Sequence, residues 1–407
     1  MAMPEVAIPA LRMAAAGGLL LLMGLTPAGA QEDAGAPPFT TERIQLIESE
    51  SADEWHYEFY RNYAYTCGYE GYQTFLLAYR EDVPLSAARP LWMRLHGGGG
   101  GAWLGDGTYS PSVHFPRMLQ EEGFKALGQH FRDRGLLEYV KNHSAGFRFL
   151  LPSLCDHDFY SGVGQPDLNN PNNPDENGEE RRLDGLRANL AALAFARQRL
   201  NAEHVFLHGT SAGSMGAMSL TAALGRQGTH LSGSVSDSWV LNSYLLPLML
   251  SGCRGLRGVP TPADPDLFLD RLGFYAKDEN LPDVAVSEGL VQTPLFLLWD
   301  RDDPGMCARE EMTLRNQKGE ELTGEASWLQ NQALAKAIDD HNPGGASQWR
   351  RVCVDDPALP DSKCDRHSPT RFDVAKFGGD HSRQGEDYNQ VILDWVTDRL
   401  ADKALEP

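Results

Sequence analysis

Residues 204–213 read His-Val-Phe-Leu-His-Gly-Thr-Ser-Ala-Gly. The apolar run over 204–207 is typical of a buried strand, and the small residues that follow predict a helix over 211–223. Between them lies a Gly-x-Ser-x-Gly pattern, whose small flanks permit the sharp strand-to-helix turn that exposes a serine hydroxyl. A helix N-terminus also favours negative charge that develops nearby. Because strand, pattern and helix coincide, the stretch predicts Ser211 as a nucleophile rather than a chance match.

Strand and helix patterns alternate on both sides of this stretch. Further strands are expected at 74–79, 91–95, 147–151, 231–235, 294–298 and 371–377, and further helices at 179–200 and 388–399. Strands that alternate with crossover helices form a mostly parallel sheet covered by helices. No internal repeat interrupts this order. The expected fold class is therefore α/β, a mostly parallel central sheet flanked by helices.

The first thirty residues have the pattern of an export signal. Arg12 precedes an apolar run over 13–25, and Ala-Gly-Ala at 28–30 offers a small-x-small cleavage site. The apolar run is short for a membrane-spanning helix. We therefore expect residues 1–30 to be a signal peptide and the mature protein to be secreted or periplasmic.

The remaining chain divides unevenly. Residues 31–43 are rich in Pro, Gly and Ala and are expected to form a flexible leader. Residues 44–407 are expected to form a single catalytic domain, with insertions at about 156–180 and 309–363. The first insertion is dense in Asn, Pro and Asp, which is typical of a surface loop. The second is partly helical, and insertions between late strands often shape a substrate pocket.

The charge balance excludes two classes of partner. Lys and Arg total 36 against 56 Asp and Glu, which gives a formal net charge of -20. Such a surface repels nucleic acid and anionic lipid headgroups. No stretch after the export signal is long and apolar enough for a membrane helix. We therefore expect neither nucleic-acid binding nor membrane insertion.

All six cysteines follow the predicted cleavage site. An even number in an exported chain predicts disulfides, although fifteen connectivities are possible. The pair Cys353 and Cys364 is the favoured bridge, because the ten-residue gap between them is short and contains two prolines. No Cys-x-x-Cys pair or paired histidine spacing is present, so the pattern does not predict a metal site.

A second glycine-rich segment lies upstream, directly after the strand expected at 91–95. Residues 96–103 read His followed by five glycines, Ala and Trp. Glycines let backbone N–H groups approach the oxyanion of a tetrahedral intermediate closely. We assign Gly97 and Gly98 as oxyanion donors, together with the N–H of Ala212. Trp103 is a candidate substrate-binding residue, with a packing role as the alternative.

A serine nucleophile of this type needs an acid and then a histidine later in the chain. Residues 299–304 read Trp-Asp-Arg-Asp-Asp-Pro and follow a predicted strand. Asp303 is the favoured acid, because it lies where the strand has ended. Asp300 and Asp302 are then solvated or bound to the neighbouring arginine. Asp237, after a different strand, is the rival acid.

Three histidines follow the acid. His381 is the favoured base, because Gly-Gly-Asp-His at 378–381 follows the expected last strand at 371–377. His367 is the rival, held rigidly if the cysteine three residues before it is bridged. His341 is the third candidate.

These pieces together resemble the pectin acetylesterase/Notum family over about residues 91–395. The similar segments are 95–103, 147–162, 209–213, 236–241 and 294–303. The resemblance implies the α/β-hydrolase fold and a triad acid at Asp303 rather than Asp237. A Cys-x-x-His ending in that family would favour His367, whereas a Gly-x-x-His ending in bacterial relatives would favour His381. Ala102 stands where the family has a cysteine beside the glycines.

The resemblance implies a secreted serine esterase with deacetylase-like activity, for which acylated polysaccharides are one substrate class. Other secreted esterases share parts of the pattern, so polyesters and lipids are alternative substrates. A catalytically inactive relative that binds glycans through the same cleft is a further alternative. Acyl transfer through a Ser-His-Asp triad needs no cofactor, and none is expected.

Overall fold

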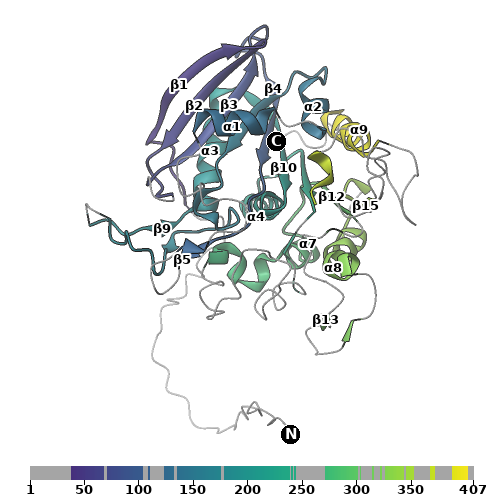
Figure 1. Cartoon of the computed structure of the whole chain (residues 1–407). Coiled ribbons are helices and arrows are strands. Elements are labelled where there is room, and N and C mark those ends of the chain that lie inside the picture. The colour runs from purple at the N-terminus through teal and green to yellow at the C-terminus, as the bar shows by residue number, and fades with distance from the viewer. Residues whose placement is uncertain are drawn as a thin grey trace, which may run out of the picture. The chain divides into compact units, whose positions relative to one another are not determined.

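A nine-stranded sheet runs through the computed structural model of the chain (Figure 1). Its strands, from one edge to the other, are β1 (Ile44–Ala52), β2 (Trp55–Asn62), β3 (Gln73–Arg80), β7 (Arg148–Pro152), β4 (Arg89–Leu95), β10 (Ala202–Thr210), β11 (Gly233–Asp237), β12 (Leu295–Asp300) and β15 (Gln348–Val352). The structure describes residues 38–67, 71–103, 109–110, 123–132, 135–175, 178–238, 240–241, 243, 271–300, 303, 314–315, 321–322, 326–342, 345–352, 367–371 and 387–401.

The six strands from β7 to β15 are parallel to one another. The three strands at the other edge pair in antiparallel fashion, and β3 joins them to β7. In the parallel part Gly209 of β10 pairs with Leu95 of β4 on one side and with Ser236 of β11 on the other. Segments that follow these three strands therefore emerge together at one edge of the sheet.

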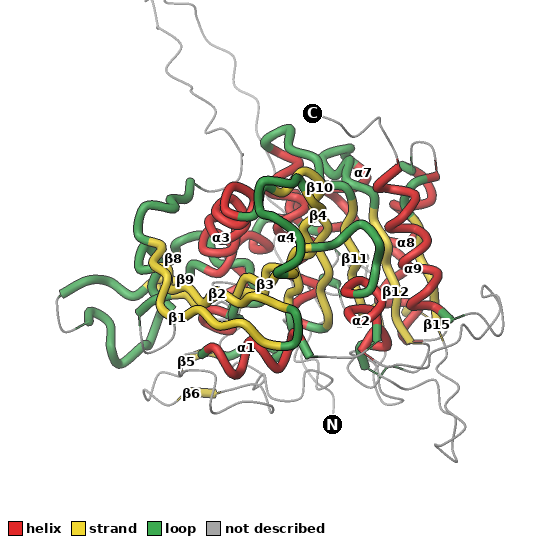
Figure 2. The backbone as a smooth tube through the Cα atoms, turned by 90° about the horizontal axis from the view of Figure 1, so that it is seen from above, coloured by secondary structure: helices red, strands yellow, loops and turns green. Residues whose placement is uncertain are grey.

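Helices cover both faces of the sheet, as the view from above shows (Figure 2). They are α1 (Phe124–Phe131), α2 (Leu136–Lys141), α3 (Gly185–Arg199), α4 (Ala212–Arg226), α7 (Pro282–Ser287), α8 (Ala326–Asp340) and α9 (Tyr388–Ala401). One core cluster joins the sheet to α3, α4, α7 and α8, and the other joins it to α1, α2 and α9. None of the helices in the described ranges is long and apolar enough to span a bilayer.

Short elements complete the described chain. They are the two-stranded pairs β5 (Ala102–Trp103) with β6 (Tyr109–Ser110), β8 (Gln165–Pro166) with β9 (Arg182–Leu183) and β13 (Leu314–Arg315) with β14 (Glu321–Leu322), and the 3-10 helices η1 (Cys155–His157), η2 (Gly273–Ala276), η3 (Asp278–Asn280) and η5 (Pro369–Arg371).

Alternation along the strands explains why both faces are covered. Trp92 belongs to one cluster and its neighbour Met93 to the other, and Phe206 and Leu207 divide in the same way. Successive side chains of a strand point to opposite faces, so a strand that is apolar at every position is buried on both sides. The continuous apolar runs of the sequence are therefore the parallel strands, which confirms the α/β class.

The end of the chain departs from the sequence expectation. The sheet receives its edge strand β15 from residues 348–352, inside the stretch expected to be an insertion. In the predicted strand 371–377, Arg371 instead ends the 3-10 helix η5, and the other residues lie outside the described ranges. Helix α3 begins at Gly185, later than predicted, because residues 182–183 pair as β9. The antiparallel strands β1 and β2 were not predicted.

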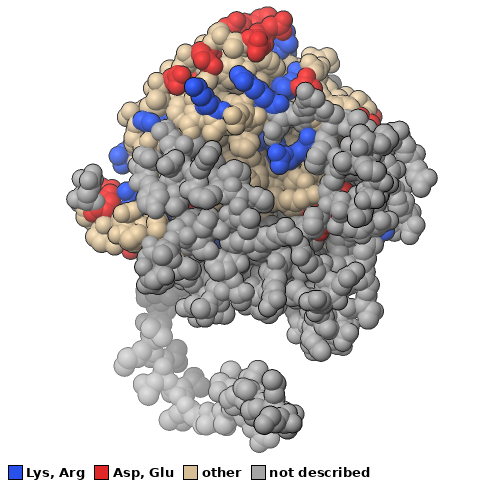
Figure 3. Space-filling model, viewed as in Figure 1, with Lys and Arg blue, Asp and Glu red and all other residues tan. Residues whose placement is uncertain are grey.

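Charged side chains gather at the end of the sheet opposite to the C-terminus of β10. Arg80 forms ion pairs with Glu54 and Asp82, and acidic and basic side chains lie side by side in this region of the space-filling view (Figure 3). Because β3 is antiparallel to β7, its last residue lies at the N-terminal ends of the parallel strands. Exposed pairs of this kind contribute little to stability, because water and salt screen their charges.

Candidate active site

Ser211 lies at the sharp corner between β10 and α4. Its backbone angles, φ 55° and ψ -122°, are unusual for a residue other than glycine. The corner needs glycine on both sides, because a Cβ on Gly209 would collide with the carbonyl of Gly213, and a Cβ on Gly213 with the carbonyl of Leu95. The Ser211 hydroxyl does not cap the helix. The predicted strand-to-helix turn is therefore present, with its serine half-buried.

The glycine segment after β4 packs directly against this corner. A Cβ built on Gly97 would lie 2.9 Å from Cβ of Ser211, 3.0 Å from the carbonyl oxygen of Thr210 and 3.6 Å from Oγ of Ser211. The segment is held from the other side, because the Tyr160 hydroxyl donates a 3.0 Å hydrogen bond to the carbonyl of His96. Only a glycine allows the backbone to approach the serine this closely.

The other residues assigned from the sequence lie in or beside this region. Gly98 is buried in the same segment. Ala212 is fully buried and opens α4, so its N–H is one of the helix's unpaired N-terminal donors. Trp103 is only 5% exposed. Little of its indole surface is exposed, and its substrate-binding role stays a prediction.

An imidazole and a carboxylate meet after β12. Nδ1 of His367 lies 2.9 Å from one carboxylate oxygen of Asp303 and 3.0 Å from the other. The Asp303 side chain is fully buried, whereas that of His367 keeps 34% of its surface exposed. Burial lowers the pKa of His367, but the hydrogen bond and charge of Asp303, helped by the charge of Asp237, outweigh it and raise the pKa above 6.5.

The structure thus joins the favoured acid to the rival histidine. His381, the favoured base, lies outside the described residues, as do Asp302 and the predicted disulfide partners Cys353 and Cys364. His341 is exposed beyond the end of α8.

Asp237, the rival acid, has other partners. It is fully buried at the end of β11, and its carboxylate accepts hydrogen bonds from the hydroxyls of Ser238 and Thr370. Sequence reasoning did not find these two hydroxyl residues, nor His208, which lies 3.0 Å from Thr370 Oγ1 through Nε2. The only signal was the Ser-Asp-Ser stretch at 236–238, noted for its family likeness.

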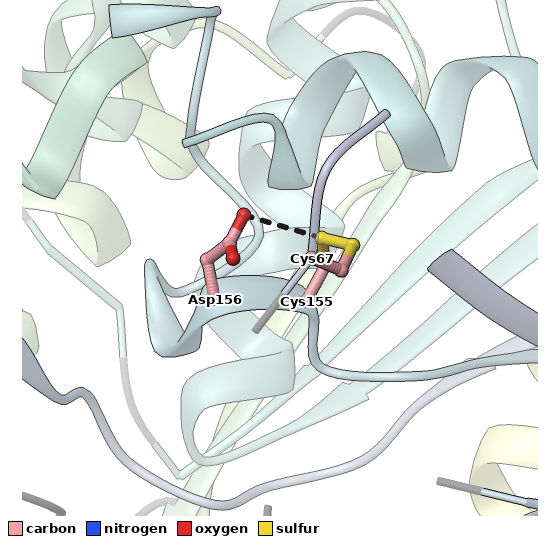
Figure 4. A group of neighbouring side chains, drawn as sticks. All are labelled: Cys67, Cys155 and Asp156. Carbon is pink, nitrogen blue, oxygen red and sulfur yellow. Dashed lines mark hydrogen bonds between the residues drawn. A yellow bond between two sulfur atoms is a disulfide. The ribbon is translucent and has the colours of Figure 1, made fainter. Parts of the chain in front are cut away.

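A disulfide joins Cys67, before β3, to Cys155, after β7, and Asp156 Oδ2 lies 3.3 Å from the Cys155 sulfur (Figure 4). A bridged sulfur carries no proton, so this approach is a contact rather than a true hydrogen bond. The three residues also lie close enough to share a metal ion, but the S–S bond removes the thiolates that a metal needs. The bridge is therefore structural.

The bridge lies at the start of a segment that supports the glycine segment. Two residues after Cys155, the carbonyl of His157 accepts a 3.1 Å hydrogen bond from the N–H of Gly101. The ring of Phe159 fills the space where a Cβ on Gly100 would lie. The disulfide thus fixes the start of the segment that carries His157 and Phe159, which contact the glycine segment.

The chain matches no known protein-family profile and no curated protein sequence. Solved structures resemble it only distantly. A glucuronoyl esterase from Solibacter usitatus is 12% identical with a TM-score of 0.44, over 90% of this chain and 88% of that one. An S-formylglutathione hydrolase from Agrobacterium tumefaciens is 11% identical with a TM-score of 0.35, over 72% of this chain and 86% of that one. Prolyl oligopeptidase B from Galerina marginata is 11% identical with a TM-score of 0.38, over 73% of this chain and 33% of that one.

These likenesses are too weak to carry an argument about activity, and the three proteins differ in their chemistry. The chain's own topology is more informative. Six parallel strands lie between two helix layers, and a strained serine follows a central strand immediately before a helix. This arrangement defines an α/β-hydrolase fold, as the sequence predicted.

Proposed function

We propose that this chain is a serine hydrolase that cleaves carboxylic esters, with Ser211 as nucleophile, His367 as general base and Asp303 as the acid that orients the imidazole. The hydrogen bond between His367 Nδ1 and the buried Asp303 carboxylate is the observation that carries the proposal. Acid and base follow the nucleophile in the chain order that this fold requires. We prefer His367 to His381 as base because of this bond.

The geometry supports a division of roles. A carboxylate accepts only, so Nδ1 of His367 must donate to Asp303, which leaves Nε2 of the neutral ring as an acceptor. Nε2 then takes the Ser211 proton as the oxygen attacks the ester carbonyl. The N–H groups of Gly97, Gly98 and Ala212 stabilise the oxyanion, the alcohol leaves with the proton, and water attacks the acyl-enzyme with the same base.

Within the ester class we propose short acyl groups, such as acetyl, carried by a polysaccharide. The support is the motif resemblance to pectin acetylesterases. The measurement is a comparison of 4-nitrophenyl acetate, butyrate and octanoate, followed by acetate release from acetylated pectin and xylan. Rates that rise with acyl length would contradict the short-acyl assignment and favour a lipid or polyester substrate.

We also propose that the protein acts outside the cytoplasm. The support is the export pattern of residues 1–30 and the disulfide between Cys67 and Cys155, because such bridges persist in oxidising compartments. Mass spectrometry of the exported protein should find an N-terminus close to residue 31. An intact N-terminus with reduced cysteines would contradict this proposal.

The activity is tested on the nucleophile. Wild-type protein should hydrolyse 4-nitrophenyl acetate and react with a fluorophosphonate probe, and peptide mapping should find the probe on Ser211. Ser211→Ala should lose both properties, whereas Ser49→Ala, on the exposed face of β1, should keep them. A folded wild-type protein that neither labels nor turns over would favour a glycan-binding relative without activity.

The base is tested by a pair of variants. His367→Ala should lower kcat by about 10⁴-fold, because the loss of a triad member removes proton transfer from the serine. His381→Ala should keep at least about a tenth of the activity. Circular dichroism checks that both variants are folded. The reverse ranking would move the base to His381.

A further inference from the structure

Asp237 contacts the nucleophile corner through its main chain. Its carbonyl oxygen accepts a 3.0 Å hydrogen bond from the N–H of Ser211 and another from the Ser214 hydroxyl. The Ser214 oxygen also lies 2.9 Å from the carbonyl oxygen of Gly209, so its single proton is shared between the two carbonyls. The last residue of β11 thus holds both the nucleophile and the first turn of the helix behind it.

The side chain of the same residue reaches the segment that carries His367. One carboxylate oxygen accepts a 2.8 Å hydrogen bond from the hydroxyl of Ser238, whose oxygen accepts a 2.6 Å bond from the N–H of Ser368. The other oxygen accepts from the Thr370 N–H at 2.9 Å and from the Thr370 hydroxyl. Both chains of bonds end within three residues of His367.

The protons in this network can be counted. The Thr370 hydroxyl has one proton and gives it to the carboxylate, so His208 Nε2 must carry the proton of the 3.0 Å bond to Thr370. Burial lowers the pKa of His208, which keeps its ring neutral. All three donors that face Asp237 need an acceptor, which is the ionised carboxylate.

We propose that Asp237 is a positioning residue that fixes Ser211 through its main chain and His367 through its carboxylate, so that one residue sets the geometry between nucleophile and base. This inference rests on the proposed function. Transfer of a proton between two side chains is sensitive to their spacing, and a displacement of about 1 Å can cost on the order of 10²-fold in rate. A carboxylate is costly to bury, so simple packing does not account for it at this place.

The charge of Asp237 offers a readout that a purely structural residue would not give. Within the described ranges, the charged groups that act on His367 are Asp303 after β12, Asp237 at the end of β11 and Arg371 in η5. The two carboxylates favour protonation of the imidazole and Arg371 opposes it. Burial raises the pKa of Asp237 itself to about 6, so it is ionised at pH 8. Neutralising it should shift the titration of His367 to lower pH.

The first test is Asp237→Asn in the exported protein, with 4-nitrophenyl acetate as substrate. We expect kcat to fall about 10- to 100-fold with little change in KM, and the acid limb of kcat/KM to move to lower pH. Fluorophosphonate labelling of Ser211 should slow in parallel. An active wild-type protein beside a folded variant with unchanged kcat and an unmoved acid limb would overturn this inference alone. A wild-type protein with neither turnover nor labelling would overturn the proposed function and this inference with it.

A matched pair at Thr370 decides the question if Asp237→Asn does not fold. Thr370→Val keeps the shape but removes the hydroxyl bond, and we expect about a tenfold loss of kcat at pH 8. Thr370→Ser restores the hydroxyl and should recover most of that loss. Equal activity of the Val and Ser variants would show that the carboxylate does not position His367, and would overturn the proposal.

Discussion

Replacement of Gly97 by alanine tests the contact between the glycine segment and the nucleophile. The new methyl group would lie 2.9 Å from Cβ of Ser211 and 3.0 Å from the carbonyl oxygen of Thr210. Carbon atoms do not approach that closely, and both neighbours belong to the strained corner, so the segment must move away from Ser211. The displacement carries the proposed oxyanion donor with it, and loss of one such donor costs about 10²–10³-fold in kcat, or about 2.7–4 kcal/mol.

The assay compares kcat for 4-nitrophenyl acetate and the rate of fluorophosphonate labelling in wild type, Gly97→Ala and Gly128→Ala. Gly128 lies within α1, and a Cβ there would meet no described heavy atom within 4 Å apart from the adjacent backbone of its own helix. Alanine in a helix interior adds about 0.5–1 kcal/mol of stability relative to glycine, so this control should melt slightly higher at unchanged activity. A folded Gly97→Ala protein with wild-type kcat and labelling rate would refute the reasoning.

Three further outcomes are expected. Cys67→Ser/Cys155→Ser should lower the free energy of unfolding by about 4–5 kcal/mol, since the bridge closes a separation of 88 residues; a loss under about 1 kcal/mol in urea denaturation contradicts this estimate. Because the pKa of His367 is raised above 6.5 and only the neutral ring accepts a proton, kcat/KM should fall as pH drops through that raised value; a constant kcat/KM well below pH 6.5 contradicts it. Asp303→Asn should cost about 10⁴-fold in kcat and move the acid limb to lower pH, and a loss under about tenfold would remove Asp303 from the triad.

The parallel core could be predicted because its strands are buried on both faces. Apolar runs such as 91–95 and 294–298 have few other interpretations, and both are strands. Edge strands lack this signal. β1 is exposed at most positions and alternates little. β15 reads Gln-Trp-Arg-Arg-Val, and the side chains of residues 348–351 are partly exposed. Their pairing depends on the neighbouring strand rather than on their own pattern.

Contacts between residues far apart in the sequence could not be predicted at the site. The nucleophile corner is local, so Ser211 and its glycines could be identified from ten residues. The bond between His367 and Asp303 spans 64 positions, and neither local sequence reveals which histidine reaches the acid. The bridge between Cys67 and Cys155 joins residues 88 apart, and a preference for short gaps gave no indication of it. The bridge between Cys353 and Cys364 stays a prediction, because both residues lie outside the described ranges.

The hydrogen bonds after β11 and β12 have a consequence for how this fold can accept changes in length. Asp303 is held at the end of β12 by the bond of its N–H to the Asp300 carbonyl, and the start of the His367 segment is held at Ser238. Between these two points the chain also supplies α8 to the core and β15 to the sheet, so these two elements must be kept. Doubling the length of a flexible connection costs only about 0.6 kcal/mol of closure entropy. Connections next to α8 and β15 can thus be lengthened at small cost while the hydrogen bonds at Asp303 and Ser238 stay unchanged.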